Sequence, residues 1–310
     1  MTDFPMLDFR RLTLLVGVAR LGSISAAAVE AGCTASSASE QLSKLEAELG
    51  TALLERSARS VRLTVAGMEL AEHGRSLIAQ AEAAERAVKE IAGLSGGRVR
   101  VAAYQTGAAR FVIPAIATFL RRRPQVRVMF DEMEPETGLM AVAEGAADIA
   151  LVNSYLGLKV PEMNGLEVVE LGQDPFILAV PARFSTPSGT ASLSDFADAP
   201  WISGRPDKGF QAITELAASR AGFTPDIVAR ADNYALMLDL VAGGLGVALI
   251  PSSAVRTKAS VKAYELRESF DLARLECLVK RASDRAPATL ELCELIVMRF
   301  RDTTKGAQAG

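Results

Sequence analysis

The spacing of apolar residues along the chain changes once, at the glycine- and serine-rich segment 93–97. Before this segment, apolar residues recur every three or four positions, which is the spacing of buried helix faces. After it, short apolar runs typical of strands alternate with helical segments, an order that favours a parallel sheet with helices on both faces. The chain of 310 residues therefore divides into a helical N-terminal part and a larger α/β part.

Three short helices are predicted in residues 9–50. The first has an apolar face at positions 12, 15, 16 and 19, and Gly22 ends it. Ser23 and Thr34 are suited to cap the second and third helices, because a hydroxyl there can accept a hydrogen bond from a backbone amide one turn later. The third helix has one apolar face and one face of small and polar residues. Two helices joined by a tight turn, the second with a short-side-chain outer face, form the helix-turn-helix pattern.

A pair of short strands is predicted after the third helix. The sequences LLER at 53–56 and VRLT at 61–64 flank a polar turn, as in a two-stranded wing. Arg56, Arg59 and Arg62 fall within seven positions and can reach phosphates or a minor groove. Residues 1–66 carry seven basic and seven acidic side chains, so any affinity for DNA depends on how these charges are arranged.

A long helix without proline is predicted from Val65 to about Ala92. At about 1.5 Å per residue it would span roughly 40 Å, which suits pairing with a second chain. Gly93 and the glycines at 96–97 would form a flexible joint after it. Apolar and small residues alternate in steps of four and three, the heptad spacing of a coiled-coil seam. The seam residues are Leu70, Gly74, Leu77, Ala81, Ala84, Val88 and Ile91.

The residues after 97 predict two α/β lobes. Strands are expected at 98–103, 126–130 and 148–152, with helices at 111–120 and 137–144. A second set has strands at 176–180, 227–231 and 247–250, with helices at 208–221 and 235–242, and the chain closes with a strand at 275–280 and a helix at 287–301. Connections that cross between two lobes leave a cleft, which is the usual place for a small ligand.

The residue counts remove most enzyme chemistries. With a single histidine, His73, a zinc site or a His-based triad lacks its parts. The three cysteines show no C-x-x-C or metal-ligand spacing and are interpreted as small apolar residues in a reducing compartment. The glycines at 243–246 follow a predicted helix and open a strand, the reverse of a dinucleotide-binding fingerprint. The sequence therefore predicts no catalytic residue, no metal site and no cofactor.

Charge and hydropathy limit the partners of the chain. Its net charge of −3 gives no overall attraction to nucleic acid. The longest late apolar run, 240–251, contains three glycines and is shorter than the roughly 20 residues of a membrane span. Asp3 and Asp8 lie where a secretion signal would be positive. A cytoplasmic protein that does not contact a membrane is expected.

Several motifs make nearly the whole chain resemble the LysR-type transcriptional regulators. They occur in the order and spacing of that family: GSISAAA at 22–28, LEAELG at 45–50, LLER at 53–56, VRLTVAG at 61–67 and AGGLGVALIP at 242–251. The resemblance implies an α/β protein with an all-α-plus-wing N-terminal domain. Its parts would be a winged helix-turn-helix domain at 1–66, a linker helix for dimerisation at 67–94 and an effector-binding domain at 95–310.

The effector-binding domain would be similar to type 2 periplasmic binding proteins, with lobe I at about 98–160 and 267–310 and lobe II at about 161–266. The resemblance also implies three partners: double-stranded promoter or operator DNA, a small-molecule effector, and further copies of the chain. Such regulators form homodimers that usually assemble as dimers of dimers.

The helix-turn-helix pattern and the resemblance together predict residues that contact DNA. They are Ser25, Thr34, Ala35, Ser36, Ser39, Glu40 and Ser43 from the helices, with Arg56, Arg59 and Arg62 from the wing. Two of them depart from the family pattern, since Ala35 stands where glutamine is common and Glu40 stands where a basic residue is frequent. Because Ala35 lacks a long amide and Glu40 repels phosphates, we expect a base preference shifted from the family average.

The resemblance also implies which residues bind the effector. They are Tyr104, Gln105, Thr106, Asn153, Ser154, Ser203 and Asn233. These are uncharged hydrogen-bonding side chains at predicted strand ends near helix N-termini, which together favour a small anion such as a carboxylate. Helix capping is the alternative role for several of them.

Two other functions remain open at this stage. The chain could be a cytoplasmic solute-binding module with a dimerising helical N-terminus, although the wing disfavours this. It could also be an enzyme that uses the cleft, although a nucleophile and base pair is not apparent. A DNA-binding regulator controlled by a small molecule is the function we expect.

Overall fold

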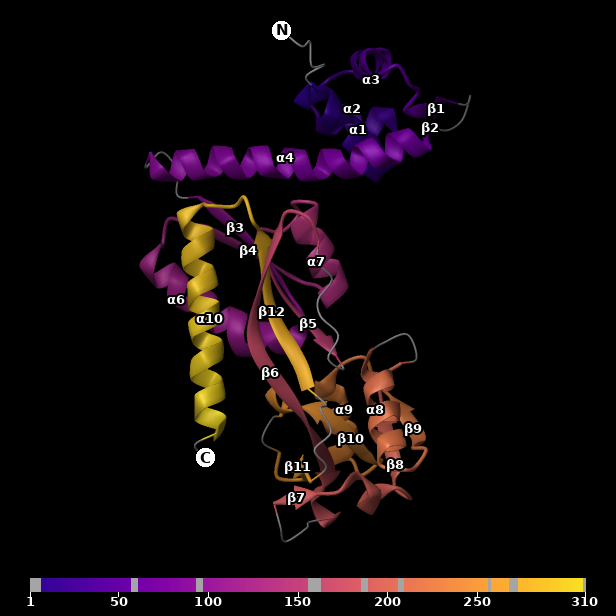
Figure 1. Ribbon diagram of the computed structural model, residues 1–310, viewed down its shortest axis with the longest axis vertical. Helices are drawn as coiled ribbons and strands as arrows, with labels where there is room; N and C mark the ends of the chain where they lie inside the picture. Colours follow the sequence, from indigo (N-terminus) through magenta and orange to yellow (C-terminus); the bar gives the residue numbers. More distant parts are fainter. Residues whose placement is uncertain are drawn as a thin grey trace.

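A computed structural model describes residues 7–56, 61–92, 97–155, 163–184, 189–205, 209–255, 258–267 and 273–308. Figure 1 shows three parts: a small helical head, the long helix α4 (Val65–Ile91), and two lobes that follow one another below α4. The predicted joint falls mainly on residues 93–96, outside the described residues. Within the described ranges, no helix is long and apolar enough to span a bilayer.

The head is the predicted winged helix-turn-helix. Its elements are α1 (Phe9–Leu21), α2 (Ile24–Glu30), α3 (Ala35–Leu49), β1 (Leu54–Arg56) and β2 (Val61–Leu63). Ser23 accepts a hydrogen bond from the amide of Ala26, and Thr34 accepts one from the amide of Ser37, so both predicted caps are confirmed. Gly22 ends α1 with a φ of 66°, a left-handed conformation that favours glycine.

Helix α4 packs against α1 through its N-terminal half. Gly74 is required there, because a Cβ at this position would lie 2.8 Å from Leu12 Cδ1. The predicted seam is therefore wrong in its first part, since Gly74 is covered by α1 of the same chain and Leu70 packs against the core of the head. Later seam residues are exposed, including Leu77 and Val88, the latter by 66%.

Lobe I contains three parallel strands, followed by two antiparallel ones, β12 (Ala273–Arg281) and the first half of β6 (Leu166–Pro181). Strands β4 (Arg127–Glu132), β3 (Arg98–Ala103) and β5 (Ile149–Tyr155) run parallel, and β12 pairs antiparallel with β5. Its helices are α7 (Pro135–Ala143), α10 (Pro287–Gln308), and a helical path made of α5 (Gln105–Gly107), a π-helical turn (Ala108–Val112) and α6 (Ile113–Arg122). The helix predicted at 111–120 thus begins earlier, directly after β3.

Lobe II is built around the second half of β6 (Leu166–Pro181). Its other strands are β7 (Thr190–Ala191), β8 (Pro200–Ser203), β9 (Asp226–Arg230), β10 (Val247–Pro251) and β11 (Val261–Leu266). Its helices are α8 (Gly209–Arg220) and α9 (Tyr234–Ala242), with short 3₁₀ turns at Ala182–Phe184, Leu193–Phe196 and Ser252–Ala254. The buried Trp201 of β8 belongs to the core of this lobe.

The sheet is mixed and continuous, which corrects the prediction of a parallel sheet. The strand order is β4-β3-β5-β12-β6-β10-β8-β9, and β11 also pairs with β6. Strand β6 pairs antiparallel with β12 over Leu166–Pro175 and with β10 from Phe176 onwards. The lobes therefore meet inside β6, later than the boundary expected at about 161. No strand was predicted for the first half of β6, because this half is only partly buried and lacks an apolar run like that of 176–180.

Candidate DNA-binding face and effector pocket

The outer face of α3 carries most of the predicted DNA-contacting residues. Ala38, Leu42 and Leu45 bury the opposite face in the head. The exposed side chains are Thr34, Ala35, Ser36, Glu40 and Ser43, and Ser39 is half-buried between them. Ser25 is exposed on α2. Because most of these side chains are short, another molecule can approach the backbone of α3 closely.

Glu40 is paired within its own helix. Its carboxylate lies 2.7 Å from Nζ of Lys44, one turn later. The hydrogen bond and charge of Lys44 lower the pKa of Glu40, so this carboxyl stays ionised. The pairing keeps a negative charge on the outer face of α3, although Lys44 partly offsets it.

The wing is a two-stranded antiparallel ribbon beside α3. Glu55 lies opposite Arg62 in the register of β1 and β2, and the side chain of Arg62 is exposed. Arg56 ends β1. Arg59 lies outside the described residues.

A small, partly open pocket with a cavity volume of about 60 Å³ lies where the two lobes meet. It brings together the end of β3, the end of β5 and the start of α9. Five of the predicted effector residues line it, namely Tyr104, Gln105, Thr106, Asn153 and Asn233. One of these also has a structural role, because the Asn233 side chain accepts a hydrogen bond from the amide of Leu236 and caps α9.

Two predicted effector residues do not line this pocket. Ser154 lies between Asn153 and Tyr155 on β5, and successive strand residues point to opposite faces. Ser203 is fully buried at the end of β8, where its carbonyl accepts a hydrogen bond from the amide of Ala231.

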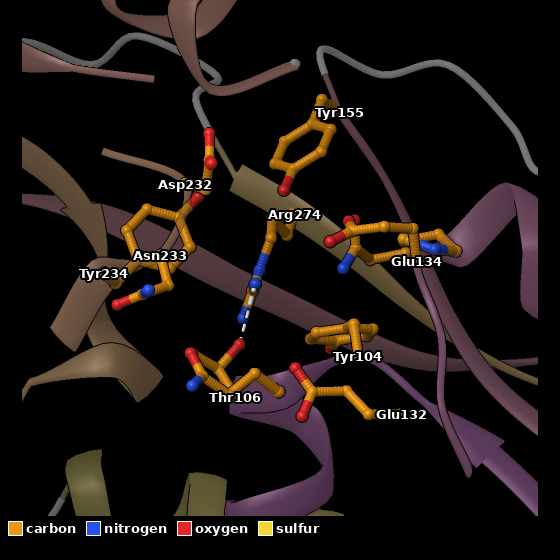
Figure 2. A pocket seen from close by; sticks show the side chains of 12 residues that line it. Tyr104, Thr106, Glu132, Glu134, Tyr155, Asp232, Asn233, Tyr234 and Arg274 are labelled. Atoms are coloured by element: carbon orange, nitrogen blue, oxygen red, sulfur yellow. Dashed lines mark hydrogen bonds between the residues drawn. The ribbon is translucent and has the colours of Figure 1, made fainter. Parts of the chain in front are cut away.

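The pocket contains a buried arginine that the sequence did not predict. Arg274 of β12 is 1% exposed, and its Nη1 donates to Thr106 Oγ1 at 3.1 Å. Its Nη2 lies 2.7 Å from Asp174 Oδ2 and 3.2 Å from Glu276 Oε1. The rings of Tyr104 and Tyr234 flank the guanidinium, with 5.0 and 5.9 Å from their centroids to Cζ. Figure 2 shows Arg274 in the middle of these side chains.

Contacts from lobe II also hold the carboxylate of Asp174. Its Oδ1 accepts hydrogen bonds from Ser252 Oγ at 2.8 Å and from the amide of Ser253 at 3.0 Å. Ser253 Oγ accepts a hydrogen bond from Arg274 at 2.9 Å. Arg274 and Asp174 thereby connect β12 of lobe I to the turn after β10 of lobe II.

Behind Arg274, Glu276 has an unusual protonation equilibrium. Burial raises its pKa to about 7, while the charge of Arg274 and the hydroxyl of Tyr104, which donates to Glu276, act in the opposite direction. The pKa of Tyr104 is also raised well above its usual value, mainly by burial. Arg274 has a raised pKa although burial lowers it, because the surrounding phenols and carboxyls favour its charge.

Three carboxylates lie among the residues that line the pocket, and the sequence did not predict them. Glu132 ends β4, Glu134 precedes α7, and Asp232 precedes the cap of α9. Asp232 forms an ion pair with Arg205, 2.9 Å apart. The charged residues in ARLECLVKR at 273–281 were a detectable signal for Arg274 and Glu276, since alternate charges in an apolar strand require partners.

Comparison with known sequences gives matches over both parts of the chain. Residues 9–68 match the family described as "Bacterial regulatory helix-turn-helix protein, lysR family", and residues 92–301 match "LysR substrate binding domain". The chain is 32% identical over 256 residues to the "Probable hydrogen peroxide-inducible genes activator" of Mycobacterium avium, covering 80% of this chain and 79% of that protein. It is 27% identical to the regulator AlsR of Bacillus subtilis, over 80% of this chain and 82% of that one.

Solved structures share the fold. A full-length OxyR variant from Pseudomonas aeruginosa has a TM-score of 0.70 at 21% identity and covers 96% of this chain and 95% of its own. CbnR in complex with its target DNA has a TM-score of 0.61 at 22% identity, over 94% of this chain and 100% of that chain.

Proposed function

The chain belongs to the LysR family of transcriptional regulators, and on that premise we propose which of its surfaces meet DNA and effector. It has a helix-turn-helix DNA-binding domain and an effector-binding domain. The solute-binding module and the enzyme, which the sequence left open, find no support in these matches, and we propose no catalytic step. A DNA-binding regulator must have access to chromosomal DNA, so we propose a cytoplasmic location.

The exposed face of α3 is the observation that carries the DNA-binding proposal. Helix-turn-helix proteins insert the second helix of the motif into the major groove. In that position Ala35 and Ser39 face base edges, while Arg59 and Arg62 of the wing contact phosphates. Thr34, Ser36 and Ser43 line the same surface, Ser25 is exposed on α2, and Arg56 is proposed as a further DNA contact from the wing. Glu40 can accept a hydrogen bond from a cytosine amino group.

A salt-dependent gel shift tests this proposal. The full chain is incubated with DNA fragments that flank its own gene, at salt concentrations from about 50 to about 200 mM. Binding that weakens steeply over this range and persists on one fragment in excess competitor DNA is expected. Absence of binding even at the lowest salt concentration would overturn the DNA-binding proposal.

We assign the effector site to the pocket between the lobes. Its lining residues come from both lobes, so a ligand there contacts both and has a different affinity for different lobe arrangements. Lobe I also touches α4, because Arg75 forms an ion pair with Glu144 at 3.3 Å and Ala79 packs against Gly145. These contacts provide a route from the pocket to the helix that carries the head. Identical DNA footprints with and without a saturating effector would contradict this coupling.

The C-terminal half of α4 is the proposed dimer surface. Leu77, Ala81, Ala84 and Val88 keep the heptad spacing and are exposed in the single chain. A second copy of α4 would bury them, and we propose that two such dimers associate into a dimer of dimers. The mass of the protein in solution, measured by light scattering, tests both steps.

We propose no peroxide-sensing role for the two buried thiols, Cys277 and Cys293. The relative from Mycobacterium avium is named for hydrogen peroxide, and oxidation of a cysteine starts from its thiolate. Burial raises the pKa of both Cys277 and Cys293 to about 12, so both remain protonated near neutral pH. The third cysteine, Cys33, is half-buried in the turn before α3 and does not line the pocket.

A further inference from the structure

The charges that line the effector pocket are not balanced. Two of the pocket's charged groups are paired, since Arg274 meets Asp174 and Asp232 meets Arg205. Glu132 and Glu134 have no ion pair within the part of the chain that the structure describes. Both side chains are exposed, so among the described residues the pocket presents two negative charges without an ion-pair partner to whatever occupies it.

The carboxylate of Glu134 is not used to cap the helix that follows. Glu134 occupies the N-cap position of α7, but its side chain accepts no capping hydrogen bond. Figure 2 shows the carboxyl groups of Glu132 and Glu134 directed toward the middle of the pocket, where Arg274 and Thr106 lie. Both carboxylates are therefore placed to contact a ligand.

A buried amide adds a third acceptor. Asn153 lines the pocket and is 7% exposed, and its Oδ1 has no hydrogen-bond partner. Its orientation is defined by Tyr104, whose hydroxyl donates to Glu276 and also forms a hydrogen bond with the Asn153 side chain. Since the one hydroxyl proton goes to Glu276, the amide NH₂ of Asn153 is the donor to Tyr104. Its oxygen is then left for the ligand, which must supply a donor.

From these three acceptors we propose that the effector is a small organic molecule with a protonated amine, held by Glu132, Glu134 and Asn153. This inference rests on the proposed role of the pocket as the effector site. An ammonium group supplies three donors and a positive charge, which matches two carboxylates and an amide oxygen. The sequence favoured an anion because only uncharged side chains had been assigned to the site.

Two other ligand classes fit the pocket less well. An anion would need Arg274, but both of its Nη atoms already donate, to Thr106 on one side and to Asp174 and Ser253 on the other. Only its Nε lacks a partner. A metal ion would need a cluster of ligands, and among the described residues no group of three or more His, Cys, Asp or Glu side chains is placed to hold one.

The test is ligand binding to the full chain by calorimetry. The probes are 1,4-diaminobutane and other short primary amines, with succinate as a dicarboxylate of similar length. The variants are the double substitution Glu132→Gln and Glu134→Gln, the single substitution Asn153→Leu, and Glu136→Gln as the matched control. Glu136 is an exposed carboxylate in the first turn of α7 that does not line the pocket. Each variant is first checked for wild-type DNA binding and an unchanged unfolding midpoint.

We expect an amine to bind the wild type and Glu136→Gln equally, and to bind the double variant and Asn153→Leu at least about tenfold more weakly. Succinate should not bind. Tighter binding of succinate than of any amine would overturn the inference, as would an equal loss in Glu136→Gln or no binding of any amine. If the wild type binds DNA, each of these results contradicts only the amine inference and leaves the regulator function supported. If the wild type does not bind DNA, that result counts against the proposed function and does not bear on the amine inference.

Discussion

Arg274 and Asp174 face each other in the register of β12 and β6, with Nη2 2.7 Å from Oδ2, at the level where lobe I passes into lobe II. Both side chains are at least nine-tenths buried. A buried ion pair of this kind is costly to break, because removal of one partner leaves the other charge without compensation. The stability of the junction between the two lobes therefore depends on a contact between residues that are 100 positions apart.

The first prediction concerns this pair. Arg274→Met should lower the free energy of unfolding by about 3 kcal/mol, because it leaves Asp174 buried and unpaired. Adding Asp174→Asn should restore part of the loss. Urea unfolding followed by the fluorescence of Trp201, the only tryptophan, measures both. As a control, Arg267→Met at the exposed pair with Asp195 should cost less than about 1 kcal/mol. Equal losses from Arg274→Met and Arg267→Met would refute the prediction.

A second prediction follows from the pKa of Glu276, which burial raises from 4.5 to about 7. The folded chain holds a proton that the unfolded chain releases, so this group lowers the free energy of unfolding as pH rises from about 4.5 to about 7. The whole effect is about 3 kcal/mol. Glu276→Gln cannot ionise and should lose this dependence. Unfolding of both proteins across that pH range checks it, and parallel pH curves would show that Glu276 is not the group.

The third prediction concerns the contact between α4 and lobe I. Gly145 has a φ of 77°, and a Cβ there would lie 1.9 Å from the Cβ of Ala79. Gly165 has a φ of 81° but open space around it, so Gly165→Ala introduces the backbone strain without the clash. Gly145→Ala should cost at least about 1 kcal/mol more stability than Gly165→Ala. It should also change the DNA footprint, and an unchanged footprint would separate this contact from DNA binding.

The fourth prediction is that the exposed half of α4 forms the dimer. Val88→Glu places a charge in the heptad seam and should raise the dissociation constant of the dimer by at least about tenfold. Val29→Glu on α2 is the control, since Val29 is also exposed but lies off the seam. Light scattering over a dilution series measures the dimer fraction. A dimer that is unaffected by Val88→Glu, or affected equally by Val29→Glu, would place the interface elsewhere.

The fifth prediction separates two kinds of DNA contact. Arg62→Ala and Arg59→Ala should weaken binding on all DNA sequences and reduce the salt slope by about one each. Ser39→Ala should instead change the preference at one base position. Binding to a library of operator variants at two salt concentrations distinguishes the two effects. A uniform loss from all three substitutions would argue against this division of roles.

The head could be predicted from sequence because its signals are local. A glycine with a left-handed φ ends α1, and the hydroxyls of Ser23 and Thr34 cap helices within three residues of themselves. Such signals lie within one turn of the element they define, so a single sequence contains them. The seam on α4 was only half correct, since periodicity does not reveal which chain covers an apolar stripe.

The pocket could be predicted only in part, because its charged residues meet across long separations. Tyr104 and Asn153 lie at strand ends, which the alternation of strands and helices locates. Arg274 and Asp174 lie inside strands, and their pairing depends on the register between β12 and β6. The first half of β6 was not recognised as a strand, so the partner of β12 was missing from the prediction.

The continuity of β6 restricts how the two lobes can move. Its 16 residues extend roughly 50 Å, with hydrogen bonds to β12 along one stretch and to β10 along the next. Each ladder lies within one lobe, so a bend or a twist of β6 where Pro175 meets Phe176 changes the angle between the lobes and leaves both ladders intact. A ligand held between the lobes would therefore act on the angle between them, and the single continuous strand fixes the place along the chain where that angle can change.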